Sequence, residues 1–508
     1  MDVLKNSVND RSLDPENQPK GLLTKIKSIV WPVHKNELNK FVPTFLIFFL
    51  LAYVYDMLRI IKSSIVVAES QVGAEIIPFL KVWAVIPGAF LITGLAMRLS
   101  HRFDREKIFY IMLSFFIVFY VLFIFFIYPN RSSLDLESLS LFLTRVLPEG
   151  AGGLVSMIGH WPLSVFYVIT ELWGTILLSM LIWGFANEIT SIEQAGRFYP
   201  LFLLGANSAA IFAGLTSAYY AGHDFNPDLP FGSSAWEQSL MFYLSTAVVC
   251  GFLVMLLFYY MHWQGVVYTP DQKIKKNEKV KLTLSECLDC LRNSKHLLYI
   301  ALLVLSYNLV FNLSDVLWEN QLKMLYLDDA AGMARYKSHI TTLTGTLSVI
   351  ISLFVSGNLL RRCGWKYAAY LTPVTISITC TGFFWLLLFQ ETASTPDILL
   401  NLTSNPINLT LFFGSIQMVF SRGCKYTLFD TSKEIAFIPL STTEKRYGKA
   451  AIDGVGSRMG KSAGSLLVQL LLLTCNSISA ATPYMAFTII IMLGVWCFAV
   501  KGLSKKLG

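Results

Sequence analysis

Long apolar runs recur along most of the chain, each about as long as a helix needs to cross a bilayer, and short polar segments separate them. We predict twelve transmembrane helices, six before and six after a polar stretch at residues 263–295. A short basic loop follows the second predicted helix of each half, SHRFDREK in the first and RRCGWK in the second. The pattern therefore predicts an all-α polytopic membrane protein made of two repeated six-helix bundles.

The polar segments divide the chain into four parts. Residues 1–40 form a polar tail and an interfacial amphipathic piece, residues 41–262 the first bundle, residues 263–295 a basic linker, and residues 296–508 the second bundle with a short tail. Most of the 41 Lys and Arg residues fall on one side of the membrane in this arrangement. The positive-inside rule makes that side the cytoplasm, so both ends of the chain are expected there.

Composition excludes several classes of protein. With 54% hydrophobic and only 15% charged residues, the chain is not expected to be a soluble enzyme. Its net charge of +8 follows the membrane topology and so does not indicate nucleic acid binding. The eight cysteines are scattered, and the single C-x-x-C of Cys287 and Cys290 lacks a second pair or nearby histidines. We therefore expect no disulfide framework, no metal site and no cofactor. Neither a signal peptide nor a transit sequence is recognisable at the N-terminus.

The stretch between residues 425 and 464 is the most polar part of the predicted membrane region. Four cations lie there at or near membrane depth: Lys425, Lys433, Arg458 and Lys461. A charge at the centre of a spanning helix costs roughly 2.5–3.5 kcal/mol, so these cations indicate function and favour an anionic substrate. Arg422, Lys425 and Phe429 are spaced to share one helical face. Arg458 also fits a simpler interpretation, in which its side chain extends to the cytoplasmic interface.

The same stretch contains a misleading motif. GVGSRMGKS resembles a phosphate-binding P-loop, but Val455 stands where the motif requires glycine, and a helical, membrane-length apolar run follows. Nucleotide hydrolysis is therefore not expected there. Gly456, Gly460 and Gly464 instead form a stripe of small residues that allows another helix to approach closely.

Helix 1, expected from Phe41 to Lys62, is unusually polar in its outer half. Tyr55, Arg59 and Lys62 fall on one face, and Asp56 precedes Arg59 by about one helical turn. This face is a candidate for lining a cavity. The alternative is that Lys62 is an anchor that reaches the external interface from the end of its helix.

Two other helices of the first half carry isolated charges. Helix 2 contains Pro78 and Pro87 and is predicted to be kinked, with Lys81 as a secondary candidate for the cavity. Helix 4 carries Glu171 in an apolar run, where a carboxylate must be protonated or meet a cation from another helix. A purely structural ion pair is the alternative for this residue.

Helix 7 begins the second half and has a polar stripe on an otherwise apolar surface. Its members are four, three and four residues apart: Asn308, Asn312, Asp315 and Glu319. In helix 5 the small residues of GANSAA suit a tight helix interface, and Asn207 is a candidate for facing the cavity. The polar stripe of helix 7 is acidic, whereas that of helix 1, the first helix of the other half, is cationic.

Ionisable residues in the first helix of each repeated half are typical of an alternating-access transporter of the major-facilitator type. The substrate would then bind between the bundles near the middle of the membrane. Intramembrane cations suit phosphate or carboxylate groups, while Tyr55 and Phe429 are candidates either for stacking on a nucleobase or for filling the core.

Several segments resemble the nucleotide transporter family, which comprises the ATP/ADP translocases of chlamydiae, rickettsiae and plant plastids. They are LRIIK, ELWG with WGFANEIT, GAN, KYTLFD with SKEIAFIPL, GKAAID and RMGKSAGS, and the resemblance extends from Trp31 to Leu503. It implies that the lysines matching the family's, Lys62 and Lys461, bind phosphates. It also implies that Glu171 and Asp315 pair with these lysines in the unloaded states or help to couple transport.

The chain departs from the pattern of the family's ATP/ADP exchangers beside these positions. Helix 1 has Ile60 and Ser63 where the exchangers usually have acids, and helix 7 has Glu319 where they usually have lysine. The family also contains proton-coupled importers of nucleoside triphosphates, and Asp315, Glu319 or Glu171 is able to carry a proton. ATP/ADP exchange by alternating access is the leading prediction, and proton-coupled net import is the alternative.

These interpretations imply further properties. We expect a nucleotide, and in the alternative also protons, to be the partners of a monomeric carrier that spans the inner membrane of an obligate intracellular bacterium. Arg59, Lys425 and Arg458 are expected to assist Lys62 and Lys461 in phosphate binding, and Asn312 is a candidate polar contact. A membrane enzyme acting on nucleotides is a remote alternative, because the sequence contains no catalytic triad, no H-E-x-x-H and no complete P-loop.

Overall fold

The computed structural model describes residues 33–100, 102–265, 294–391, 406–441, 444, 448–449, 452 and 457–507. Every regular element in these ranges is helical. The main elements of the first half, residues 33–265, are α3 (Leu38–Glu69), α4 (Ile76–Phe79), η4 (Leu80–Val85), α5 (Ile86–Ser100), α6 (Arg105–Leu122), η5 (Phe123–Ile127), α7 (Arg131–Leu134), α8 (Glu137–Val146), α9 (Gly152–Gly159), α10 (Trp161–Trp173), η7 (Gly174–Ile182), α11 (Trp183–Ile189), α12 (Ile192–Ala221) and α13 (Ala235–Trp263). Those of the second half, residues 294–507, are α15 (Lys295–Tyr326), α16 (Ala330–Ile350), η9 (Ile351–Ser356), α17 (Gly357–Cys363), α18 (Trp365–Glu391), α20 (Pro406–Cys424), η10 (Lys425–Phe429), α21 (Asp430–Ala436), α23 (Ser457–Cys475) and α24 (Ile478–Leu507).

Ten helices in the described ranges are long and apolar enough to cross a membrane, so the chain is a multi-pass membrane protein. The tenth and eleventh spans expected from the sequence correspond to α20 with η10 and α21, and to α23. Neither belongs to the ten. The first of them is rich in charge, and α23 has a shorter apolar run, Ser462–Cys475. The exact number of twelve spans in two bundles therefore stays a prediction.

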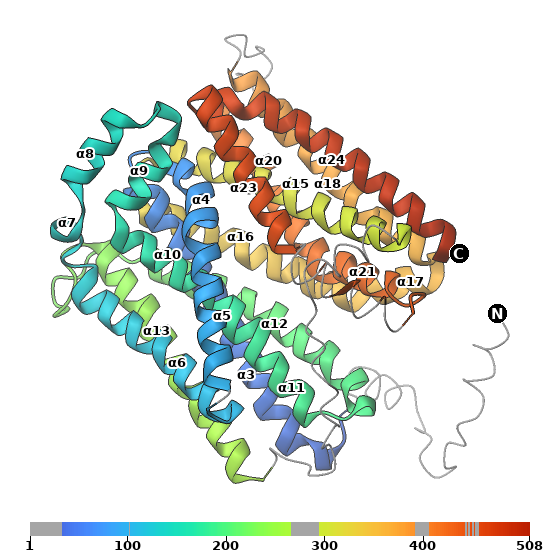
Figure 1. Ribbon diagram of the computed structural model, residues 1–508. Helices are drawn as coiled ribbons and strands as arrows, with labels where there is room; N and C mark the ends of the chain where they lie inside the picture. Colours follow the sequence, from blue (N-terminus) through green and yellow to red (C-terminus); the bar gives the residue numbers. More distant parts are fainter. Residues whose placement is uncertain are drawn as a thin grey trace, which may run out of the picture.

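Figure 1 shows helices of the first half on one side of the molecule and most helices of the second half on the other, with α16 near the boundary. There α16 packs along α12 of the first half. A Cβ atom at Gly214 would lie only 2.6 Å from the carbonyl oxygen of Ser338, and one at Gly345 only 2.8 Å from the backbone nitrogen of Ile211. Glycine therefore lets these two helices approach closely, and Ala210 of GANSAA lies at this interface, 3.0 Å from where a Cβ atom at Gly345 would be.

The first two predicted helices differ from regular spans in the ways that Pro87 and Lys62 explain. The irregularity predicted for helix 2 is present as the π-helical segment η4, which ends just before Pro87, a residue with no N–H to continue the hydrogen-bond ladder. Helix 1 was expected to end at Lys62, but α3 continues to Glu69. That expectation was wrong, because Lys62 is neutralised inside the protein and the apolar residues after it continue the span.

Hydrogen bonds join the two halves near the end of the molecule at which α3 and α15 end, which we call the joined end. Lys323 Nζ donates to the carbonyl oxygen of Ala68 at 2.9 Å, and the backbone N–H of Ile478 donates to Glu75 at 3.2 Å. With the orientation predicted from the basic loops, the joined end faces away from the cytoplasm.

Candidate functional site

A cavity of about 800 Å³ lies between the two halves. Side chains from α3, α4, η4, α5, α10, η7, α15, α16, α20, η10 and α23 line it. The lining includes six cations, Arg59, Lys62, Lys81, Lys337, Arg422 and Lys425, and three carboxylates, Glu171, Asp315 and Glu319. Asp56 and Asp430 pair with two of these cations from outside the lining, so the described charged groups at the cavity carry an excess of one positive charge. Such a cavity favours an anionic ligand.

Lys62 and Glu171 form a direct ion pair between α3 and α10. The ammonium of Lys62 also lies 4.6 Å from the centre of the Tyr167 ring, a cation–π contact. Lys62 is only 5% exposed, so its side chain is buried in the protein and does not reach the external interface as an anchor. Glu171 meets a cation from another helix, which is one of the two states expected for a carboxylate in an apolar run.

Arg59 lies one turn before Lys62 on the same helix and pairs with Asp56 at 3.0 Å. Its guanidinium is 6.0 Å from the centre of the Tyr55 ring. Tyr55 packs directly against Gly174 at the start of the π-helical segment η7, where a Cβ atom would come within 2.5 Å of the ring. The glycine of ELWG therefore gives the tyrosine its place on the cavity wall.

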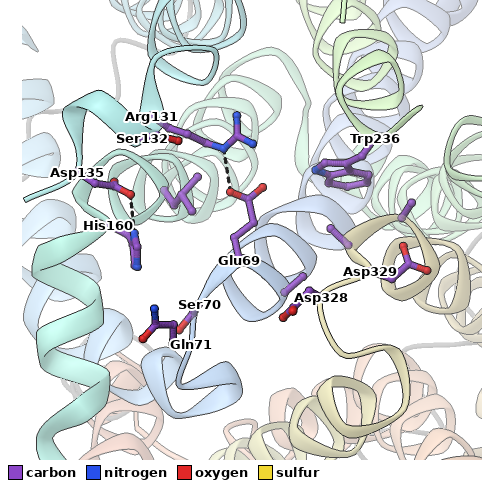
Figure 2. A pocket seen from close by; sticks show the side chains of 14 residues that line it. Glu69, Ser70, Gln71, Arg131, Ser132, Asp135, His160, Trp236, Asp328 and Asp329 are labelled. Atoms are coloured by element: carbon purple, nitrogen blue, oxygen red, sulfur yellow. Dashed lines mark hydrogen bonds and ion pairs between the residues drawn. The ribbon is translucent and has the colours of Figure 1, made fainter. Parts of the chain in front are cut away.

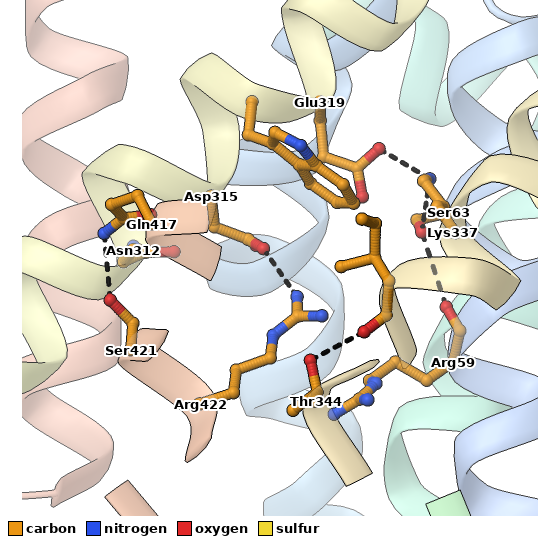
Figure 3. A network of polar contacts seen from close by, with 12 residues as sticks. Arg59, Ser63, Asn312, Asp315, Glu319, Lys337, Thr344, Gln417, Ser421 and Arg422 are labelled. Carbon is orange, nitrogen blue, oxygen red and sulfur yellow. Dashed lines mark hydrogen bonds and ion pairs between the residues drawn. The ribbon is translucent and has the colours of Figure 1, made fainter. Parts of the chain in front are cut away.

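Asp315 of α15 lies between two cations, as Figure 3 shows for one of them. Arg422 of α20 donates to Asp315 Oδ1 at 3.1 Å, and Lys81 of η4 lies 3.3 Å from Oδ2. Lys81 also donates to Asn312 Oδ1 at 2.7 Å, while Asn312 Nδ2 donates to Ser465 on α23 at 2.9 Å. The polar stripe predicted for helix 7 is thus the surface on which cations of both halves meet.

A second carboxylate of α15, Glu319, pairs with Lys337 of α16 at 2.6 Å (Figure 3). Lys337 Nζ also donates to Ser63 Oγ of the first half at 2.9 Å. All three residues are buried. Two of the departures from the exchanger pattern, Ser63 and Glu319, therefore share a single partner, which the sequence analysis did not identify.

Lys425 lies on the cavity wall but Phe429 does not. Lys425 pairs with Asp430 at 3.2 Å. Phe429 packs in the core, with ring centroids 4.8 Å from Tyr307 and 5.5 Å from Trp496. The π-helical segment η10 covers residues 425–429 and changes the register of the helix, so Phe429 leaves the face it was predicted to share with Lys425.

The remaining candidates lie elsewhere or outside the described side chains. Asn207 is half-buried on α12 and does not line the cavity. Arg458 and Lys461 belong to α23, but their side chains fall outside what the structure describes. The backbone of α23 does approach the site closely, because a Cβ atom at Gly464 would lie 2.8 Å from Asn312 Nδ2. The predicted stripe of small residues therefore packs against α15 where the structure describes it.

No pattern in the sequence pointed to Lys337, and Lys81 was only a secondary candidate. Lys337 lies eight residues into α16, close to the joined end and two residues after Arg335, so by sequence it resembles an ordinary interfacial lysine. Tyr167 and Tyr426 were also not identified among the many aromatic residues. A lone lysine within a predicted span was the only sequence signal available for Lys81.

A second, more polar cavity of about 550 Å³ lies at the joined end (Figure 2). Residues of the first half, including Glu69, Arg131 and His160, face Asp328 and Asp329 of the second half. Arg131 pairs with Glu69 at 3.1 Å, and His160 pairs with Asp135 at 2.7 Å. No cluster of His, Cys, Asp and Glu suited to a metal ion occurs among the described residues.

Comparisons with known proteins agree along the whole chain. The family profile described as "TLC ATP/ADP transporter" matches residues 16–507. The protein is 37% identical to ADP,ATP carrier protein 1 of Chlamydia trachomatis over 95% of this chain and 91% of that relative. It is 34% identical to the chloroplastic ADP,ATP carrier protein 1 of Arabidopsis thaliana, over 94% of this chain and 76% of the relative. It is 33% identical to ADP,ATP carrier protein 1 of Rickettsia typhi, over 95% of this chain and 96% of that relative.

Solved structures resemble the fold at low sequence identity. A bacterial homologue of the iron transporter ferroportin in its inward-facing state superposes with a TM-score of 0.57 at 15% identity, over 93% of this chain and all of the other. A D-xylose–proton symporter superposes with a TM-score of 0.55 at 13% identity, over 91% of this chain and 96% of the other. These matches show that the all-helical fold is shared with solved membrane transporters.

Proposed function

Because the chain belongs to the TLC ATP/ADP transporter family, we propose that it carries ATP and ADP across a bacterial inner membrane, one in exchange for the other, by alternating access. The family is one of transporters, so the sequence-based prediction of a carrier and not an enzyme is confirmed. The observation that carries the proposal is the cavity between the halves, with six cations among its described lining residues. Nucleotide phosphates supply the complementary negative charge.

We assign the phosphates to the cations on the cavity wall. Lys62, Arg59 and Lys425 line the cavity beside aromatic rings, and α23 brings Lys461 and Arg458 into the same region of the fold. Lysine suits this role because its compact charge binds phosphate and releases it readily. Glu171, Asp315 and Glu319 hold the cations when the cavity is empty. Tyr55, which the glycine of ELWG positions, is assigned to the nucleobase.

The two halves are proposed to move as six-helix bundles, with both chain termini in the cytoplasm and the protein acting as a monomer. In alternating access the contacts at the joined end break when the cavity opens to the outside. Each charged pair within one half can travel with that half. A buried cation that loses its carboxylate partner in an unloaded carrier is costly, and this cost favours exchange over one-way transport.

Uptake of labelled ATP into proteoliposomes tests the proposal. Vesicles are preloaded with ADP or left empty, and uptake is followed at two external pH values with and without a proton uncoupler. Exchange predicts that uptake requires internal ADP and ignores the uncoupler. The absence of ATP or ADP transport under every condition would overturn the proposal.

One observation favours proton-coupled import of nucleoside triphosphates as the second candidate. Glu319 replaces the lysine of the exchanger pattern and is buried against Lys337, beside Ser63. Protonation of a buried carboxylate would release its lysine and let an empty carrier return. Uptake into empty vesicles that rises with an inward proton gradient would select this candidate.

A further inference from the structure

Lys81 connects the two halves through the cavity. Its ammonium lies 3.3 Å from Asp315 and donates to Asn312 at 2.7 Å, and both partners belong to the second half. Neighbouring residues of the same segment are docked on α23. Gln469 donates to the carbonyl oxygen of Pro78 at 2.9 Å and accepts a hydrogen bond from Trp83 at 3.1 Å. Residues 78–83 of the first half are therefore held against the second half on both sides of Lys81.

The other lining cations that the structure describes have a different arrangement. Each of the five has a carboxylate partner within its own half: Arg59 with Asp56, Lys62 with Glu171, Lys337 with Glu319, Arg422 with Asp315, and Lys425 with Asp430. When one half rotates relative to the other, these five pairs are able to travel intact. The carboxylate partner of Lys81 lies across the boundary, so this pair must separate.

Separation affects the two partners of this pair unequally. Asp315 keeps Arg422, which lies 3.1 Å away in the same half. Lys81 loses both Asp315 and Asn312. An ammonium group in a low-dielectric cavity is costly without an anionic partner, so opening the joined end requires a replacement for Asp315.

We propose that a phosphate of the bound nucleotide is this replacement, and that Lys81 therefore couples the opening of the joined end to substrate binding. The side chain of Lys81 lines the cavity and is 24% exposed, so a ligand in the cavity reaches it. The loaded carrier opens because phosphate takes the place of Asp315, while the empty carrier stays closed. This inference rests on the proposed nucleotide transport and identifies the residue that makes the transport an exchange.

Removal of the ammonium should abolish the requirement for a counter-substrate. In proteoliposomes, internal ADP should stimulate ATP uptake by wild-type protein about tenfold, which corresponds to about 1.4 kcal/mol. In Lys81→Met the stimulation should fall below about twofold, because the empty carrier reorients without leaving a cation unpaired. Lys81→Arg keeps the charge and should retain most of the stimulation.

Lys323→Met is the matched control. Lys323 also bridges the halves, but its acceptor is the backbone oxygen of Ala68, it has Asp328 in its own half, and it lies outside the cavity lining. This variant should keep the dependence on internal ADP. The inference is overturned if Lys81→Met retains the tenfold dependence, or if Lys323→Met loses it to the same extent.

A distance measurement keeps the test independent of transport. Ser132 of the first half and Ala331 of the second half line the cavity at the joined end (Figure 2 labels Ser132). Spin labels at these positions, on protein with its reactive native cysteines replaced, report whether that end opens. Without nucleotide, Lys81→Met should show a larger population of long distances than wild type and Lys323→Met. Identical distance distributions in wild type and Lys81→Met would refute the proposed role of Lys81 in keeping the joined end closed. A failure of wild-type protein to move ATP would refute only the proposed function.

Discussion

Lys337 and Glu319 form an ion pair of 2.6 Å in the membrane-spanning part of the molecule, and each side chain is only 5% exposed. The pair joins α16 to α15, and Lys337 also donates to Ser63 of the first half. Two charges that are both removed from water depend strongly on one another. Loss of one partner is therefore more harmful than loss of both.

Single and double substitutions of this pair should show that dependence. Removing one partner of a buried pair costs about 3–5 kcal/mol, so Lys337→Met and Glu319→Gln should each lower the unfolding temperature in detergent. The double variant should recover much of the loss, because it leaves no buried charge unpaired. Tryptophan fluorescence during heating measures the effect, and strictly additive losses would contradict the expected coupling.

The same carboxylate distinguishes exchange from proton coupling. If transport is exchange, uptake by Glu319→Gln still requires internal ADP and is as insensitive to an uncoupler as that of wild type. The measurement is ATP uptake at two pH values, with and without an inward proton gradient. A wild-type response to the gradient that disappears in Glu319→Gln would assign the transported proton to this residue and contradict exchange.

Lys62 should contribute mainly to affinity for the phosphates. A hydrogen bond to a charged group contributes about 1.5–3 kcal/mol, so Lys62→Met should weaken ATP binding by roughly tenfold to a hundredfold. Lys62→Arg should recover part of the affinity, because it keeps the charge but not the compact ammonium that fits between Glu171 and Tyr167. Competition of unlabelled ATP for uptake measures the change. Equal affinities in wild type and Lys62→Met would exclude Lys62 from phosphate binding.

Gly174 should matter because Tyr55 occupies the space beside it. A Cβ atom at Gly174 would lie 2.5 Å from the Tyr55 ring, so Gly174→Ala must displace the tyrosine from the cavity wall. We expect a several-fold, roughly 1 kcal/mol, loss of ATP affinity. Gly184→Ala is the control, because no atom lies within 4 Å of a Cβ atom at that position. Equal loss in both variants would show that a general effect of replacing glycine in this region, and not the displacement of Tyr55, accounts for the change.

The sequence was most informative where a property belongs to a single helix. Apolar length predicted a polytopic membrane protein, and the spacing of the helix 7 stripe predicted one shared face, all of whose members line the cavity: Asn308, Asn312, Asp315 and Glu319. The isolated Glu171 required a proton or a cation, and the structure supplies Lys62. Each of these conclusions follows from the local cost of placing polar groups in an apolar environment.

Which charges meet depends on how the helices pack in three dimensions. Nothing in the sequence connects Lys337 to Glu319 and Ser63, or Lys81 to Asp315, because these partners lie on different helices and depend on how the helices pack. Register within a helix also escaped prediction where a π-helical segment interrupted it, and so Phe429 turned into the core. The pattern of polar residues in apolar spans was enough to predict that cations lie in the membrane and that they favour an anionic substrate. Helix packing determined which of the described lining cations have a carboxylate in their own half and placed the carboxylate of Lys81 in the other half, since these contacts join segments far apart along the chain.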